Sequence, residues 1–571
     1  MKTEKKNSTE RLEFFRALYE NAKCAYSDEL DRFDKYMRQY RGSVEIDGSE
    51  ETATTVRNIT YEMVESQVSS DIPQPKADPA SYSEERDRCA QAIEMLCRSL
   101  RDRLPFEELN DLDERYTYIY GGSVWFVEWD SSADFGDVRG GVRVHCISPR
   151  DFIPQPGVYC VDDMEYCFLK FTTTRGELIR KYGIKEEDTY RAECDYQDGE
   201  FDTGDTVSII LAFYKDELGS IGEYVFSGDL TLLDMENYYK RKMQVCTVCK
   251  KPKNLCTCSA PIFRTVDIEC EDITDKRTGA VIRNVPYYLP KSFPFVIRKN
   301  TSVEKSLFGQ SDCEYIRPEQ QAINKIESRI LQKLLRAGIT PIVPEDASIT
   351  LNNSVFGQII KMKPGETLAQ YGKVDTTPDI SQDIAEAERL YDHSKRIIGI
   401  SDAYQGIGEY ANESGYARQL RISQASGRLE SKRNMKHTAY AHLDRKIFEH
   451  YLAFADEPRL LSYKDAFGRI HNACFNRYDF LIFDVNAGIF RYDDSYLFSV
   501  DLNGGADYQR ESLWQRNLEN LKAGTLGDPS AIPTLLRYWQ CQERAHYPHA
   551  RENVEYFTEL LKEENERLGS I

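Results

Sequence analysis

Four cysteines near the middle of the chain have the residue type and the spacing of a metal site. They are Cys246, Cys249, Cys256 and Cys258, in the stretch VCTVCKKPKNLCTCSAP. Thiolates favour Zn²⁺, and a tetrahedral structural site takes four of them. The first pair has the two-residue spacing of a zinc knuckle, and the second pair is tighter but can still chelate. Because four ligands close the coordination sphere, we predict one structural, not catalytic, Zn²⁺ per chain, holding a short insertion with little apolar content.

Two other interpretations of this cluster stay open, namely a loop of free thiols or two disulfides. Lys250, Lys251 and Lys253 lie between the two pairs and would partly offset the net charge of a zinc–tetrathiolate site. The N-terminus has no apolar signal core, which favours a cytosolic setting with reduced thiols. The chain has 15 cysteines, and we interpret the other eleven as small apolar core residues.

Motifs of enzymatic chemistry are missing from the sequence. There is no Gly-x4-Gly-Lys-Ser/Thr phosphate loop, no His-Glu-x-x-His and no Gly-x-Ser-x-Gly elbow. The eight histidines form no ligand spacing. We therefore predict that the protein is not an enzyme.

Length and charge narrow the class of protein further. The 571 residues are enough for about three to four domains. Lys and Arg total 74 against 94 Asp and Glu, a formal net charge of −20, which argues against a general nucleic-acid binder. No apolar run approaches the ~20 residues that span a bilayer.

The elements expected in the first half are those of an α+β body. Residues 10–40 have the apolar spacing of one helix, and 58–79 a short helix followed by a proline-rich extended strip. β-branched and aromatic runs bounded by Gly, Asp and Pro predict strands, interrupted by a short helix at Arg175–Gly183. The predicted helix and strands are Tyr82–Arg103, then Ser123–Asp130, Val142–Pro149, Glu165–Thr173, Thr206–Tyr214 and Glu223–Gly228.

Two long helices, 310–337 and 378–399, flank a short β-containing insert at 338–377. In the first helix one face carries Ile323, Ile326, Ile330 and Leu334, and a separate face carries Lys325, Arg329, Lys333 and Arg336. The basic face is either an ordinary solvated surface or a contact for DNA. The runs ITPIVP and GQIIKMKPG of the insert are too short to be stable alone, so we expect them to pair with strands of another copy.

A glycine-rich loop, Ile400–Gly415, follows the second helix and contains Tyr404 and Tyr410; it is either a linker or a mobile loop that contacts a moving partner. After it, a basic stripe would face DNA or acidic neighbouring subunits, and an apolar stripe would pack into a core. The basic stripe is Arg418, Arg421, Arg428, Lys432 and Lys436, and the apolar stripe is Tyr440, Leu443, Ile447, Tyr451 and Phe454. Further on we expect a strand pair at Tyr478–Val485 and Tyr496–Leu502, and helices over the last ~65 residues.

Several stretches, taken in order, resemble the portal proteins of tailed bacteriophages and prophages. They are residues 58–68 with their proline-rich exit, GGSVWFVEWD, VRVHCISPRDFIPQPG, RGELIRKYG, GQSDCEYIRPEQQAINKIESRIL, the β insert, the second helix and ESGYARQLRISQ. The resemblance covers most of the chain. It implies a portal-like α+β subunit with a wing, a two-helix stem, a small β-containing clip and a helical crown, assembled as a ring, usually a dodecamer.

The resemblance also implies boundaries for these parts. The wing would be 1–309, including a zinc insertion at 243–261 that is not a general feature of the family, with a continuation at 416–505. The stem would be 310–337 and 378–399, the clip 338–377, the tunnel loop 400–415 and the crown 506–571.

By the same resemblance, the ring sits at a capsid vertex of the virion, after assembly in the host cytoplasm. Double-stranded DNA is packaged and ejected through its channel without sequence readout. The terminase large subunit and later the head–tail adaptor dock on the clip, and the major capsid and scaffolding proteins are further partners. Candidate DNA-channel residues are Lys325, Arg329, Lys333, Tyr404, Tyr410, Arg418 and Arg421.

An acidic channel wall with a few basic rings would repel phosphate and let DNA slide. The main alternative is another structural head or tail connector component of a phage, without motor docking. A zinc-dependent nucleic-acid enzyme is a second rival, against which the closed cysteine spacing and the missing catalytic motifs count.

Overall fold

The fold is that of a computed structural model, which describes a large part of the chain. The described residues are 8–43, 55–81, 83–135, 138–193, 206–217, 219–239, 241–248, 258, 263–268, 270–274, 281–336, 342–344, 360–362, 365, 379–400, 427–464, 470–484, 488–501, 507–544, 550, 553–554 and 556–561.

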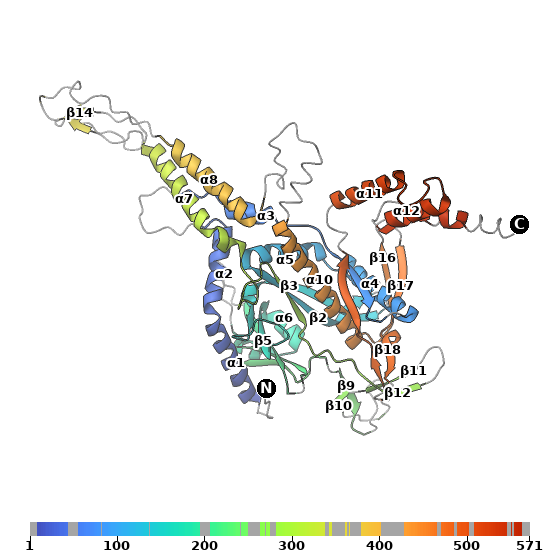
Figure 1. The fold of residues 1–571 in the computed structure, drawn as a ribbon. Helices are drawn as coiled ribbons and strands as arrows, with labels where there is room; N and C mark the ends of the chain where they lie inside the picture. The colour runs from blue at the N-terminus through green and yellow to red at the C-terminus, as the bar shows by residue number, and fades with distance from the viewer. Residues whose placement is uncertain are drawn as a thin grey trace.

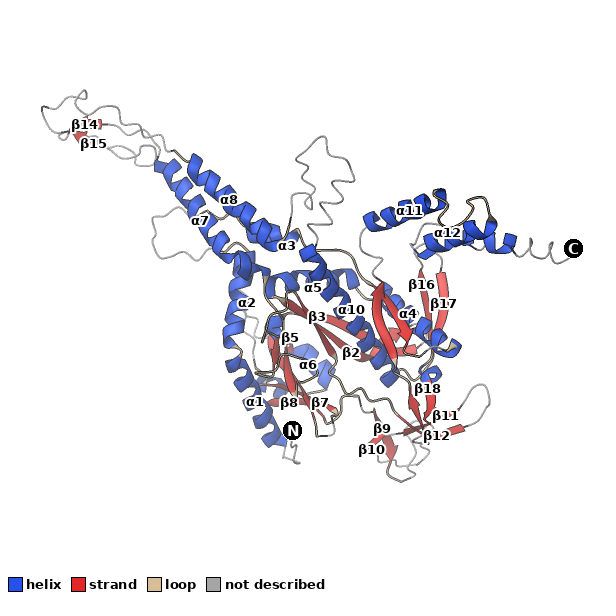
Figure 2. Cartoon of the chain, viewed as in Figure 1, coloured by secondary structure: helices blue, strands red, loops and turns tan. Residues whose placement is uncertain are grey.

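The body is α+β, as predicted, and has two antiparallel sheets at its centre (Figure 2). The larger sheet has the order β4-β5-β6-β7-β8, and the smaller has the order β13-β2-β3. The strands of the larger sheet are β4 (Phe152–Pro154), β5 (Tyr166–Thr174), β6 (Thr206–Lys215), β7 (Ile221–Ser227) and β8 (Leu230–Met235). Those of the smaller are β13 (Phe295–Lys299), β2 (Gly122–Phe135) and β3 (Val138–Ile147).

Successive side chains along these strands point to opposite faces, so each sheet packs against a core on both of its faces. In β6, Ile209, Leu211 and Phe213 belong to the core shared with the smaller sheet, whereas the intervening Ile210 and Ala212 pack under the N-terminal helices. In β2, Phe126 points into the core between the sheets, and Trp125 into a third core beyond the smaller sheet. Because both faces of each sheet are covered, the sequences of these strands are nearly continuous runs of apolar residues.

Helices cover the outer faces of the two sheets (Figure 1). On the larger sheet lies α1 (Ser8–Ala25), which continues into α2 (Ser27–Tyr40). On the smaller sheet lie α5 (Phe106–Tyr120) and α10 (Gly427–Phe454), and α4 (Glu84–Arg103) packs against α10. The predicted apolar stripe of α10 is confirmed as core, since Tyr440, Leu443, Ile447 and Tyr451 are buried and Phe454 is partly buried against the core between the sheets.

Local sequence explains where several helices begin and end. The short helix α6 (Arg175–Tyr182) is capped by the Thr174 hydroxyl, which accepts from the Glu177 amide, and it ends at Gly183 with φ +66°. Helix α5 ends at Gly121 with φ +91°, a left-handed conformation that favours glycine. A Cβ at Gly122 would lie 2.6 Å from the Arg298 carbonyl oxygen, so this Gly-Gly pair lets α5 turn into β2 against β13.

Short two-stranded ribbons complete the body. The segment 58–79 folds as predicted into α3 (Ile59–Glu65) and β1 (Gln74–Pro79), which pairs with β20 (Tyr496–Asp501). The other antiparallel ribbons are β9 (Arg241–Cys246) with β10 (Phe263–Ile268), β11 (Cys270–Thr274) with β12 (Val281–Pro286), β16 (Arg459–Lys464) with β17 (Ile470–Phe475), and β18 (Leu481–Asp484) with β19 (Ile489–Tyr492).

A two-helix hairpin projects from this body (Figure 1). It consists of α7 (Asp312–Arg336) and α8 (Ser381–Ile398), which pack side by side along their length. Both helices lie within the ranges predicted from the sequence. At the far end, β14 (Ile342–Pro344) pairs in parallel with β15 (Ile360–Met362). At the other end of the chain, α11 (Asp507–Lys522) packs on α12 (Ile532–Arg544).

Four expectations about these elements were wrong or incomplete. The single helix expected at 10–40 is two helices that meet at Tyr26, whose φ of −101° and ψ of 4° break the helical path. The strands near Tyr478–Val485 and Tyr496–Leu502 do not pair with each other, because β18 pairs with β19 and β20 with β1. Helix α5 was not predicted. The two short strands of the insert pair with each other within one chain, so their pairing does not require a second copy.

No helix within the described ranges is long and apolar enough to cross a bilayer.

Candidate functional site

The projecting hairpin is held together by a carboxylate that faces two cations. Asp383, in the first turn of α8, accepts hydrogen bonds from both Arg329 and Lys333 of α7. The Asp383 side chain is 7% exposed, whereas the side chains of Arg329 and Lys333 are 58% and 37% exposed. The hydrogen bond from Lys333 and that from Arg329 lower the pKa of the Asp383 carboxyl. This arrangement fastens the two helices to each other in the distal half of the hairpin.

Two of the three predicted channel residues on α7 are therefore engaged within the chain. Arg329 and Lys333 contact Asp383, which makes them structural cross-links of the hairpin. Lys325, one turn before Arg329, is exposed and takes part in none of the ion pairs found among the described residues. Of the three, Lys325 is the one that the structure leaves available to a partner.

The hairpin joins the body at a polar junction that we call the hairpin root, residues Asp312–Gln320 of α7. Asp312 is 2% exposed and accepts from Gln67 at 2.9 Å, from Asn300 at 2.9 Å and from the Lys432 ammonium at 2.6 Å. Gln320, about two turns further along, accepts from the amide and the hydroxyl of Thr60, each at 3.0 Å. The root is thus bound to the body by hydrogen bonds that reach α3, the exit of β13 and α10.

A second buried charge cluster lies beside the root. The Arg298 guanidinium, on β13, contacts Asp113 and Glu114 of α5, and its distance to Glu114 is 2.8 Å. Lys436 of α10 lies 3.0 Å from the same Glu114 carboxylate. Although burial works to raise the pKa of Glu114, Arg298 and Lys436 together hold it below its ordinary value. Sequence reasoning missed this cluster, because nothing in the local pattern of α5 or β13 marks these residues as partners.

The two described members of the predicted basic stripe, Lys432 and Lys436 of α10, do not lie on an open surface. Lys436 is 4% exposed, and Lys432 has a side chain that is 11% exposed. Both ammonium groups are bound to carboxylates of the same chain, so the expectation that they face DNA or a neighbouring subunit is wrong. The side chain of Arg428, the residues Arg418 and Arg421, and the loop residues Tyr404 and Tyr410 lie outside what the structure describes.

The structure describes two of the four cysteines predicted to bind zinc. The Sγ atoms of Cys246, at the end of β9, and Cys258 lie 3.9 Å apart. A disulfide would require about 2.05 Å, so these two cysteines are not bonded to each other. Two thiolates on one tetrahedral Zn²⁺, each about 2.3 Å from the metal, would be about 3.8 Å apart, which fits the observed separation.

The other two predicted ligands, Cys249 and Cys256, lie outside the described residues. Within the described part of the chain, no group of three or more His, Cys, Asp or Glu side chains is arranged to hold a metal ion. The described pair therefore fits zinc in its spacing and chemistry without completing a site.

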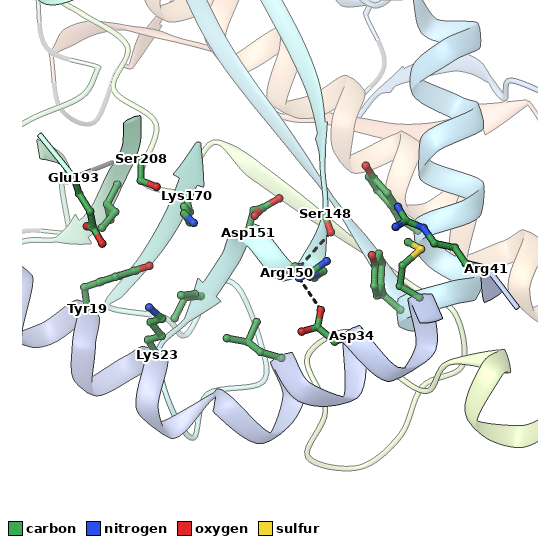
Figure 3. Close-up of a pocket in the computed structure, with 16 residues that line it drawn as sticks. Tyr19, Lys23, Asp34, Arg41, Ser148, Arg150, Asp151, Lys170, Glu193 and Ser208 are labelled. Carbon is green, nitrogen blue, oxygen red and sulfur yellow. Dashed lines mark hydrogen bonds and ion pairs between the residues drawn. The ribbon is translucent and has the colours of Figure 1, made fainter. Parts of the chain in front are cut away.

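A polar pocket of about 480 Å³ lies between α1, α2 and the larger sheet (Figure 3). Its lining mixes cations and carboxylates, and one pair of them, Arg150 and Asp34, lies 2.6 Å apart. The described lining contains neither histidine nor cysteine, so an imidazole-activated nucleophile is not among its residues. The pocket can accept a polar group of mixed charge, but its lining does not define a reaction.

No protein-family model matches this chain, and no curated protein matches it either.

Proposed function

We propose that the chain is the subunit of a bacteriophage portal ring, through which double-stranded DNA enters and leaves a capsid at one vertex. The observation that carries this proposal is the α7/α8 hairpin, which projects from an α+β body and bears a small β ladder at its far end (Figure 1). The ordered portal-like stretches in the sequence support the same conclusion. The role is structural, and we expect no catalytic activity.

In this proposal the body is the wing, the hairpin the stem, and 338–377 the clip on which the terminase large subunit and later the head–tail adaptor dock. Residues 400–415 form the tunnel loop and 506–571 the crown. A net charge of −20 on each subunit suits a channel that holds DNA loosely. Contacts with phosphate, independent of base sequence, would come from exposed cations, and Lys325 is one described candidate on the hairpin.

Imaging of the purified full chain by negative-stain electron microscopy tests the proposal. We expect rings with a central hole, and the resemblance to portal proteins implies twelve subunits; a small globular monomer at all concentrations would refute the proposal. A second experiment separates the portal from a connector without motor docking. Deleting 338–377 should abolish terminase binding in a portal, whereas a connector would keep its ring and its partners unchanged.

A third experiment addresses the channel. K325Q should weaken retention of packaged DNA to the same degree for any DNA sequence while rings still form. The double variant R329Q/K333Q is the contrasting case, because it removes the cross-link to Asp383 and should loosen the hairpin itself. If K325Q packages and retains DNA as the unmodified protein does, Lys325 is an ordinary solvated lysine.

We also propose that Cys246, Cys249, Cys256 and Cys258 hold one structural Zn²⁺ per subunit. The 3.9 Å separation of the Cys246 and Cys258 sulfurs supports thiolate ligation over a disulfide between them. Elemental analysis of the purified protein should find about one zinc per chain. C258S should reduce that content, whereas C24S, at an exposed cysteine on α1, should not. Four freely titrating thiols without zinc would contradict the proposal.

A further inference from the structure

Two lysines on successive turns of α10 reach two different parts of the body. Lys432 and Lys436 are four residues apart and so lie on the same face of the helix. Lys432 reaches the hairpin root at Asp312, with a distance of 2.6 Å. Lys436 reaches Glu114 of α5, at 3.0 Å, and donates to the Asp71 carbonyl at 2.6 Å.

Asp312 is the point where these contacts converge. It is the first residue of α7, and Gln67 donates to the same carboxylate oxygen that Lys432 contacts. Gln67 also accepts from Lys432 at 2.9 Å, which closes a ring of three polar side chains. Because the carboxylate is 2% exposed, the loss of Lys432 would leave a buried charge without its counter-charge, which is strongly destabilising.

The charges around these contacts balance. Three carboxylates, on Asp113, Glu114 and Asp312, face three cations, on Arg298, Lys432 and Lys436. A shift of the first turns of α10 would withdraw two of the three cations at once. The uncompensated carboxylates would then belong to α5 and to the hairpin root, not to α10 itself.

We infer that Lys432 couples α10 to the α7/α8 hairpin, so that the position of the first turns of α10 controls how firmly the hairpin is held on the body. The coupling acts through the buried carboxylate of Asp312, whereas Lys436 fixes the same turns of α10 to the body through Glu114 of α5. This inference does not depend on the function proposed above, since it concerns contacts within a single chain.

A coupling free energy between two elements acts equally in both directions. If Lys432 holds the hairpin root through Asp312, then Asp312 holds the first turns of α10 through Lys432. Weakening either partner must therefore loosen both elements, even though each substitution lies in only one of them.

Amide hydrogen exchange of the full chain, read by mass spectrometry, tests the coupling. In K432M, exchange across α7 and α8 should become about tenfold faster or more, because a buried carboxylate loses its counter-charge. In D312N, residues 429–440 of α10 should respond in the same direction. K432Q, which keeps a hydrogen-bond donor but no charge, should give a smaller effect and serves if K432M does not fold.

A matched control comes from the same helix. Lys446 pairs with Glu449 within α10, at 3.0 Å, and makes no contact with the hairpin. K446M should leave exchange in α7 and α8 unchanged. The inference is overturned if K432M leaves the hairpin as protected as in the unmodified protein. It is equally overturned if K432M accelerates exchange in β5 and β6 as much as in the hairpin, because the lysine would then serve global stability alone.

Discussion

Glu223 is a carboxyl group buried between the two central sheets, and it should make the stability of the body depend on pH near neutrality. It lies on β7, on the face that packs against the smaller sheet, and is 7% exposed. Burial, followed by repulsion from Glu128 of β2, raises its pKa to about 7, against a small opposing effect of Lys181. The folded protein therefore keeps a proton on Glu223 that the unfolded chain releases near pH 4.5.

The sign and the size of the effect follow from this difference. Since the folded pKa is the higher one, the stabilisation is complete below about pH 4.5 and is lost as the pH rises through about 7. Integrating the difference in bound protons gives a loss of about 1.3 kcal/mol between pH 6 and pH 8. The total loss well above pH 7 is about 3.4 kcal/mol.

The variant E223Q removes the titration and keeps the shape of the side chain. We expect its free energy of unfolding to fall less between pH 6 and pH 8 than that of the unmodified protein, by about 1.3 kcal/mol. Urea unfolding followed by tryptophan fluorescence is a suitable measurement, because Trp125 and Trp129 lie on strand β2 of the smaller sheet, which belongs to the same body. E165Q, at an exposed carboxylate immediately before β5, is the control and should leave the pH dependence unchanged. If E223Q and the unmodified protein lose the same stability over this range, the carboxyl group is ionised in the fold and the reasoning is wrong.

Burial lowers the pKa of His450 to about 4, so the free energy of unfolding should decrease as the pH falls below 6.5, the opposite of the effect of Glu223. In thermal or urea unfolding, H450F should abolish about 1.8 kcal/mol of that decrease between pH 7 and pH 5. R298M should destabilise the body by about 3–5 kcal/mol, since it leaves buried carboxylates on α5 uncompensated, and an unchanged denaturation midpoint would contradict this. D383N should speed hydrogen exchange in the distal half of the hairpin, whereas D392N, at an exposed position of α8, should not; equal exchange in the two variants would remove Asp383 as the cross-link.

The sequence by itself determined those elements whose signals are local. The strands β5 and β6 follow from runs of β-branched and aromatic residues, and α6 from a threonine cap and a terminal glycine. The two hairpin helices follow from long stretches of helical spacing, and the core position of Tyr440 and Ile447 from an apolar stripe. In each case the physical cause lies within a few residues of the element itself.

The tertiary structure decided which charges are free and which strands pair. A basic stripe has the same periodicity whether it faces water or buried carboxylates, so the burial of Lys432 depended on Asp312, 120 positions away along the chain. In the same way, β20 found its partner β1 at the opposite end of the chain, because ladder pairing depends on proximity in space. Long-range ion pairs and strand partners leave no local pattern, and for this reason only the fold could assign Arg329 and Lys333 to Asp383 and leave Lys325 exposed.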